Sequence, residues 1–168
     1  MARTTTAPSR EVDDALAPPD PRLARRVATV VAATFLLVGV LGFVPGITRD
    51  LGDITFAGHE SGAELLGLFQ VSVLHNIVHL AFGVAGLLAA RKGRTAVLYL
   101  LAGGAVYLVL ALYGGIVDHD HDANFVPLNT ADDWLHLGLG VGMIGLGLLV
   151  RQVGAQPLPT APSDRRPA

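Results

Sequence analysis

The 168-residue chain contains no cysteine. This absence excludes disulfides, thiol nucleophiles, iron–sulfur clusters and cysteine-bound zinc, so any bound metal must use histidine or carboxylate ligands. Charge is also scarce: Asp, Glu, Lys and Arg make up only 15% of the residues, and no basic patch with interleaved aromatics is present to bind nucleic acid. Phosphate-binding loops and hydrolase or metalloprotease motifs are missing as well. We therefore predict neither an enzyme nor a nucleic-acid-binding protein.

Apolar residues dominate what remains, because 51% of the chain is hydrophobic. Such a composition is too apolar for an ordinary soluble domain of this size. Four apolar runs approach or exceed the length of about 20 residues that crosses a bilayer, and they cover residues 27–44, 64–90, 95–117 and 134–150. We predict an all-α fold, an integral membrane four-helix bundle over residues 24–151, with disordered tails at residues 1–23 and 152–168.

Basic residues are distributed unevenly between the two ends of the predicted helices. Every Lys and Arg except Arg49 lies in the N-terminal tail, in the turn from Arg91 to Arg94, or at the C-terminal end. Because the cytoplasmic loops of membrane proteins carry an excess of Lys and Arg, both termini are predicted to be cytoplasmic. The expected partners are the lipid bilayer and other transmembrane helices, either from a homo-oligomer or from other membrane proteins.

Small residues at four-residue spacing, such as Gly138 and Gly142, are typical of helices that pack closely in membranes. Two longer patterns recur along the chain. F-V-P-x-x-T-x-D occurs at residues 43–50 and 125–132, and H-L-x-x-G-V occurs at residues 79–84 and 136–141. This recurrence predicts two parallel helical hairpins related by an axis along the membrane normal.

Five polar residues interrupt the apolar runs: Gln70, His75, Asn76, His79 and His136. Counted from Arg91 and Arg151, His79 and His136 lie about 18 and 22 Å along their helices, at similar depth. Polar groups inside a membrane have three explanations here. They hydrogen-bond neighbouring helices and fix their register, they relay protons or small solutes, or they bind a metal or haem, with His79 and His136 as axial ligands. Asp132 is one turn before His136 and is expected to pair with that imidazole.

A second candidate metal site is the loop with Asp118, His119, Asp120, His121 and Asp122. Imidazole and carboxylate ligands of this kind suit zinc, nickel or copper. The alternative is a solvated acidic loop, because alternating residues alone imply no coordination geometry.

The strings FQVSVLHNIVHL (residues 69–80) and NFVPLNTAD (residues 124–132), together with GFVPGIT (residues 42–48), carry a family resemblance. Over residues 27–150 the chain resembles the bacterial membrane proteins grouped as domain-of-unknown-function 4383. The resemblance implies a four-span protein of the bacterial plasma membrane and brings no activity or site residue with it.

From these features we expect a structural or interaction component of the membrane without catalytic activity or cofactor. Two alternatives stay open: a haem- or metal-binding redox protein that uses the intramembrane histidines, and a proton- or solute-conducting bundle.

Overall fold

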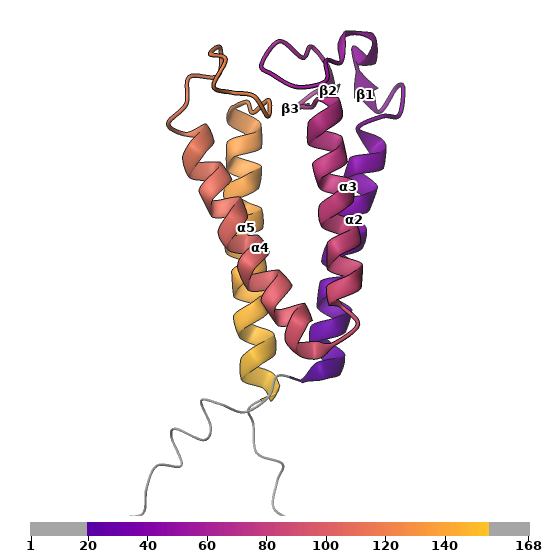
Figure 1. Ribbon diagram of the computed structural model, residues 1–168, viewed down its shortest axis with the longest axis vertical. Coiled ribbons are helices and arrows are strands. Elements are labelled where there is room, and N and C mark those ends of the chain that lie inside the picture. The colour runs from indigo at the N-terminus through magenta and orange to yellow at the C-terminus, as the bar shows by residue number, and fades with distance from the viewer. Residues whose placement is uncertain (1–19, 155–168) are drawn as a thin grey trace, which may run out of the picture.

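The computed structural model describes residues 20–154, which form four long helices and one small sheet (Figure 1). The helices are α2 (Pro21–Leu41), α3 (Val73–Ala89), α4 (Gly93–Gly114) and α5 (Thr130–Gly154). The predicted all-α fold with four helices is therefore confirmed. Most of the two tails predicted to be disordered lies outside the described residues.

The helices form two hairpins that diverge like the arms of a V (Figure 1). α2 packs along α3, α4 packs along α5, and the two hairpins meet mainly through α2 and α4. The start of α2, the α3–α4 turn and the end of α5 share one end of the bundle. We call this the basic end, because it carries Arg22, Arg25, Arg26, Arg91, Lys92, Arg94 and Arg151. The opposite end, which holds the sheet and the longer loops, is the loop end.

At the loop end, three two-residue strands form an antiparallel sheet in the order β1-β2-β3. They are β1 (Thr48–Arg49), β2 (Glu64–Leu65) and β3 (Phe69–Gln70), and a short 3₁₀ helix, η1 (Leu51–Asp53), follows β1. Thr48 pairs with Leu65, and Glu64 pairs with Gln70. The sheet therefore fills the connection between α2 and α3.

α3 is shorter than predicted, since the apolar run from residue 64 does not start a helix. Leu66 and Gly67 have positive φ angles of 58° and 65° and form the tight turn between β2 and β3. The helix begins only where the Ser72 side chain accepts a hydrogen bond from the backbone N–H of His75 at 3.1 Å. The predicted span 64–90 is wrong at its start, although its end is close to that of α3.

Capping residues also extend two other helices beyond the predicted apolar runs. α2 begins at Pro21 because the Asp20 carboxylate accepts hydrogen bonds from the N–H groups of Arg22 and Leu23. α5 begins at Thr130, since Asn129 and Asp132 each accept a hydrogen bond from the other's backbone N–H. Polar cap residues, rather than hydropathy, set these boundaries.

Both copies of the F-V-P-x-x-T-x-D pattern lie at the loop end, each between the helices of one hairpin. Their local structures nevertheless differ. Asp132 is 1% exposed in the first turn of α5, whereas Asp50 is exposed and has a left-handed φ of 45°. The repeated sequence therefore marks equivalent positions in the two hairpins but not equivalent conformations.

α2, α4 and α5 are each long and apolar enough to cross a membrane. α3 has 17 residues, which corresponds to about 26 Å of helix. Many large apolar side chains on the outside of the bundle are exposed, including Leu37, Leu98, Val109 and Val141. An apolar exterior of this kind fits insertion into lipid.

Glycine lets the helices of each hairpin approach closely. A Cβ on Gly83 of α3 would lie 2.9 Å from the Ala32 carbonyl oxygen of α2, and one on Gly104 of α4 would lie 2.8 Å from the Gly140 carbonyl oxygen of α5. Gly138 and Gly142 take no part in packing within the described chain, because a Cβ at either position would meet nothing within 4 Å. α5 uses the neighbouring face, with Gly140 and Gly147.

We expect Gly104→Ala to destabilise the bundle by about 1–3 kcal/mol, because the new methyl group overpacks the α4–α5 contact. Gly142→Ala is the matched control: it makes the same chemical change in a helix at an open position. Thermal unfolding of both variants in detergent measures the difference. Equal stability of the two variants would contradict the proposed close contact.

Candidate metal centre

Three imidazoles from two helices meet in the interior of the bundle. His75 and His79 are one turn apart on α3, and His136 comes from α5. Their side chains are 6%, 5% and 3% exposed, respectively. One ring nitrogen from each lies within 4.8 Å of those of the other two. Among the residues that the structure describes, these three histidines are the group of side chains that lie close enough together to hold a metal ion.

The helical repeat and the hairpin arrangement explain this convergence. Residues four apart lie on one helix face, so His75 and His79 point the same way, and their Nε2 atoms are 3.1 Å apart. The His75 and His136 ring centroids are 6.2 Å apart. The first hairpin therefore supplies two imidazoles and the second hairpin supplies one.

Aromatic rings from α2 and α4 pack against the histidines. Phe35 of α2 contacts His79 with a centroid distance of 5.6 Å, and Tyr107 of α4 contacts His136 at 5.3 Å. Phe35 and Tyr107 stack on each other at 5.2 Å, and Phe82 packs against both. All four helices thus contribute a ring to one continuous aromatic and imidazole cluster.

The cluster leaves polar atoms without partners. The Nδ1 atoms of His75, His79 and His136 are buried and make no hydrogen bond. The Pro127 backbone carbonyl lies near the His75 ring and makes an electrostatic contact with it. Buried polar groups without partners are rare in folded proteins, so these nitrogens mark the cluster as unusual.

A layer of backbone and side-chain hydrogen bonds covers the histidines at the loop end. The buried Asp132 carboxylate accepts from the N–H of Gln70 in β3 at 3.0 Å and from the N–H of Asn129 at 3.1 Å. The Asn129 amide donates to the Leu68 carbonyl at 2.9 Å. These bonds join the loop of the first hairpin to the start of α5. The expected Asp132–His136 pair does not form, because Asp132 is used as a cap.

The other two residues of the predicted intramembrane cluster lie elsewhere. Gln70 is in β3, where its amide donates to the carbonyls of His59 and Ser61 at 2.8 Å each. Asn76 is buried, but it faces the end of α2: a Cβ on Gly42 would lie 2.1 Å from its Oδ1. Gln70 therefore supports the covering layer, and Asn76 supports the α2–α3 contact.

The acidic loop does not assemble the second predicted metal site. His119 Nε2 lies 3.1 Å from Asp133 Oδ2 and 3.1 Å from the Gly114 carbonyl. His121 is exposed and its Nδ1 accepts from the Ala123 N–H, while Asp118, Asp120 and Asp122 are also exposed. In the described chain the loop histidines and acids thus form local bonds rather than a shared ligand set.

The three-histidine geometry is close to that of a metal centre. Tetrahedral zinc with Zn–N bonds of about 2.0–2.1 Å requires ligand nitrogens about 3.3 Å apart. His75 and His79 already meet this requirement at 3.1 Å. The widest separation of 4.8 Å would have to shorten by about 1.5 Å. A small shift of α5 or a ring rotation is enough.

The family model described as Domain of unknown function (DUF4383) matches residues 25–149. The chain belongs to that family. The match covers α3 and α4, most of α2 and α5, and the three histidines, and it assigns no activity to DUF4383 proteins. Comparison with the curated proteins and with the solved structures finds no match. Function in this DUF4383 protein must therefore be argued from its own residues.

Sequence reasoning overlooked the cap formed by Asp132. Its signal was present in the sequence, because Asn129 precedes an apolar helical run and an acidic residue follows three positions later. Interpreted as a cap, this pattern predicts that the Asp132 carboxylate bonds to the backbone at the helix start. It is then not available to pair with His136.

We expect Asp132→Ala to lower stability by about 1–3 kcal/mol per backbone donor left without a partner. The measurement is the unfolding midpoint in detergent, compared with Asp122→Ala, which removes an exposed carboxylate from the neighbouring loop. If Asp132→Ala unfolds at the same temperature as Asp122→Ala, the covering layer does not depend on this carboxylate.

Proposed function

We propose that this protein is a multi-pass membrane protein that binds one transition-metal ion through His75, His79 and His136, and that the ion joins its two helical hairpins. The observation that carries this proposal is the convergence of three buried imidazoles within 4.8 Å. The proposed role is structural: the ion holds the two hairpins together, and no catalytic step is assigned to it.

The chemistry of the ligands favours zinc or copper. Imidazole nitrogen is a borderline ligand that binds Zn²⁺, Cu²⁺ and Ni²⁺ better than Mg²⁺ or Ca²⁺, which prefer oxygen. Neutral imidazoles need lose no proton on binding, so the site suits a buried position. Three protein ligands leave one coordination position for water or another group.

A single ion fits this arrangement better than a haem. A haem with axial ligands from His79 and His136 would need its macrocycle between the two rings. Here His75 lies against both of them, with its Nε2 3.1 Å from that of His79 and its ring centroid 6.2 Å from that of His136. The alternatives of a purely register-setting role and of a proton relay are separated from metal binding by the experiment below.

We expect the protein to lie in the bacterial plasma membrane with four spans and both termini in the cytoplasm. α3 serves as the fourth span, because it runs beside α2 and returns the chain to the basic end. The positive-inside rule then places the basic end in the cytoplasm. The loop end, with Arg49 as its described cation, faces the opposite side.

Metal binding is tested on the full chain purified in mild detergent, stripped with a chelator and titrated with Zn²⁺ and Cu²⁺. We expect one ion per chain and a rise of the unfolding temperature with ion concentration, because a ligand that binds only the folded state stabilises it. His136→Gln should weaken binding at least a hundredfold, since loss of a second-shell partner alone costs tenfold to a hundredfold.

His121→Ala is the matched control, because it removes an exposed histidine from the loop. It should bind the ion as the wild type does. If the wild type takes up neither ion, and His136→Gln changes stability alone, the three histidines do not form a metal site. If His121→Ala, rather than His136→Gln, loses the ion, the site is in the acidic loop.

The absence of cysteine provides a test of orientation, because an introduced cysteine is the sole thiol in the chain. We expect Asp120→Cys at the loop end to react with a membrane-impermeant maleimide in intact cells. Arg94→Cys at the basic end should react only after lysis. The reverse pattern would invert the proposed orientation, and labelling of both in intact cells would contradict an even number of spans.

A further inference from the structure

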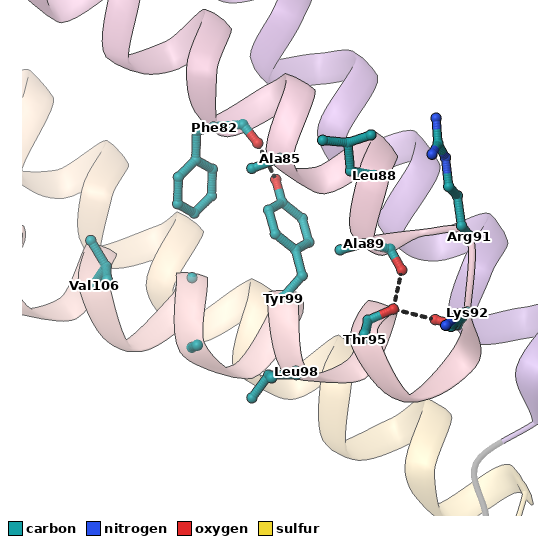
Figure 2. Close-up of a pocket in the computed structure, with 12 residues that line it drawn as sticks. Phe82, Ala85, Leu88, Ala89, Arg91, Lys92, Thr95, Leu98, Tyr99 and Val106 are labelled. Carbon is teal, nitrogen blue, oxygen red and sulfur yellow. Dashed lines mark hydrogen bonds between the residues drawn. The ribbon is translucent and has the colours of Figure 1, made fainter.

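A groove runs along the outside of the bundle between α3 and α4 and reaches the basic end (Figure 2). It encloses about 600 Å³. Its walls are almost entirely apolar and include Leu88 from α3 and Leu98 and Val106 from α4. Arg91 and Lys92, in the turn that joins the two helices, lie at its end. The groove thus combines a long apolar trough with two cations.

Small residues are the reason that the groove is open. Ala85 and Ala89 on α3 face Ala102 and Gly103 on α4, and these helices contact each other much less than α3 contacts α2. Phe82 and Tyr99 also line the groove, with ring centroids 5.2 Å apart. Leu88 and Leu98 at its rim are 51% and 63% exposed. The groove therefore faces the surroundings of the bundle rather than its interior.

The groove is long enough to extend through the hydrocarbon of one leaflet of a bilayer. From Lys92 to Val106 it follows α4 for about 21 Å, whereas half of the hydrocarbon core is about 15 Å thick. An apolar trough at this depth offers water almost no polar partner. An acyl chain that lies lengthwise satisfies both the length and the polarity of the trough.

The charged residues at the end of the groove indicate the kind of lipid headgroup that fits there. Arg91 and Lys92 are exposed, and neither forms an ion pair with any residue between 20 and 154. A second hollow at this end, of about 570 Å³, is lined by Ala90 and by Arg22, Arg25 and Arg26. Asp20 is the one acidic residue that the structure describes at this end, and it caps α2. Basic pockets beside transmembrane helices bind anionic lipid headgroups.

We propose that the α3–α4 groove binds one anionic phospholipid, with an acyl chain along its apolar walls and the phosphate held by Arg91 and Lys92. This lipid site is independent of the proposed metal centre, which lies nearer the loop end and uses other residues. The ligand is a lipid rather than a free phosphate, because the trough accounts for most of the contact.

The test is a titration of the full chain in detergent with phosphatidylglycerol and with phosphatidylcholine that carry the same acyl chains. Native mass spectrometry counts the bound lipid. We expect one phosphatidylglycerol to bind at least tenfold more tightly than phosphatidylcholine. The double variant Arg91→Gln/Lys92→Gln should weaken phosphatidylglycerol binding by about tenfold to thirtyfold, because each cation near the headgroup contributes about fivefold.

Arg94→Gln is the control, since it removes one nearby cation in the first turn of α4 that does not line the groove. It should change binding less than threefold. Ala102→Trp, which fills the trough and keeps both cations, should weaken the binding of both lipids. The thermal unfolding midpoint of each variant in detergent reports whether the bundle is intact.

Four results would overturn the proposal. The first is equal affinity for the two lipids, and the second is an equal loss of phosphatidylglycerol affinity in Arg94→Gln and in the double variant. The third is binding of chain-free glycerol phosphate as tight as that of the lipid. The fourth is a lipid-free dimer that Ala102→Trp abolishes. The last result would assign the groove to a second copy of the chain.

Discussion

Close backbone contact within each hairpin determines the shape of the whole bundle. Lipid provides no hydrophobic force between helices, so packing and hydrogen bonds must hold them together. Gly83 brings α3 onto α2, and Gly104 brings α4 onto α5. Between α3 and α4, by contrast, Gly86 and Gly103 meet the rings of Tyr99 and Phe82 rather than the backbone of the facing helix. The hairpins diverge, and larger side chains fill the space between them.

Those larger side chains are rings, and their arrangement separates two environments. Phe35, Phe82 and Tyr107 form the apolar part of the cluster, and the three histidines form the polar part next to it. An unpaired polar group in such surroundings is costly. In the proposed site, an ion held by His136 and by the Nε2 atoms of His75 and His79, which lie 3.1 Å apart, would add coordinate bonds to a weak contact between hairpins. The site and the stability of the bundle then depend on the same atoms.

Hydropathy and charge were sufficient to predict the helices of this DUF4383 protein, and the repeated pattern with the basic anchors placed His79 and His136 at a common depth. The start of α3 was not predictable in this way, because Leu65–Val71 is as apolar as the helix that follows it. What stops the helix there is the turn at Leu66 and Gly67 and the Ser72 cap. Spacing alone also could not decide which face of α5 meets α4. Glycines lie on more than one face of this helix, and Gly138 and Gly140 differ only in the side of the helix on which they lie.

Because α3 is short, the path that an ion or proton would take to its histidines differs in length between the two sides of the membrane. His75 lies two residues from the helix start, about 3 Å along its axis, beneath the hydrogen-bonded loops. From the basic end, where α3 ends at Ala89, His75 lies beyond roughly 21 Å of apolar helix. The short route passes through polar loops, and the long one passes through packed rings. In the proposed orientation, the histidines would equilibrate with the fluid outside the cell and stay insulated from the cytosol.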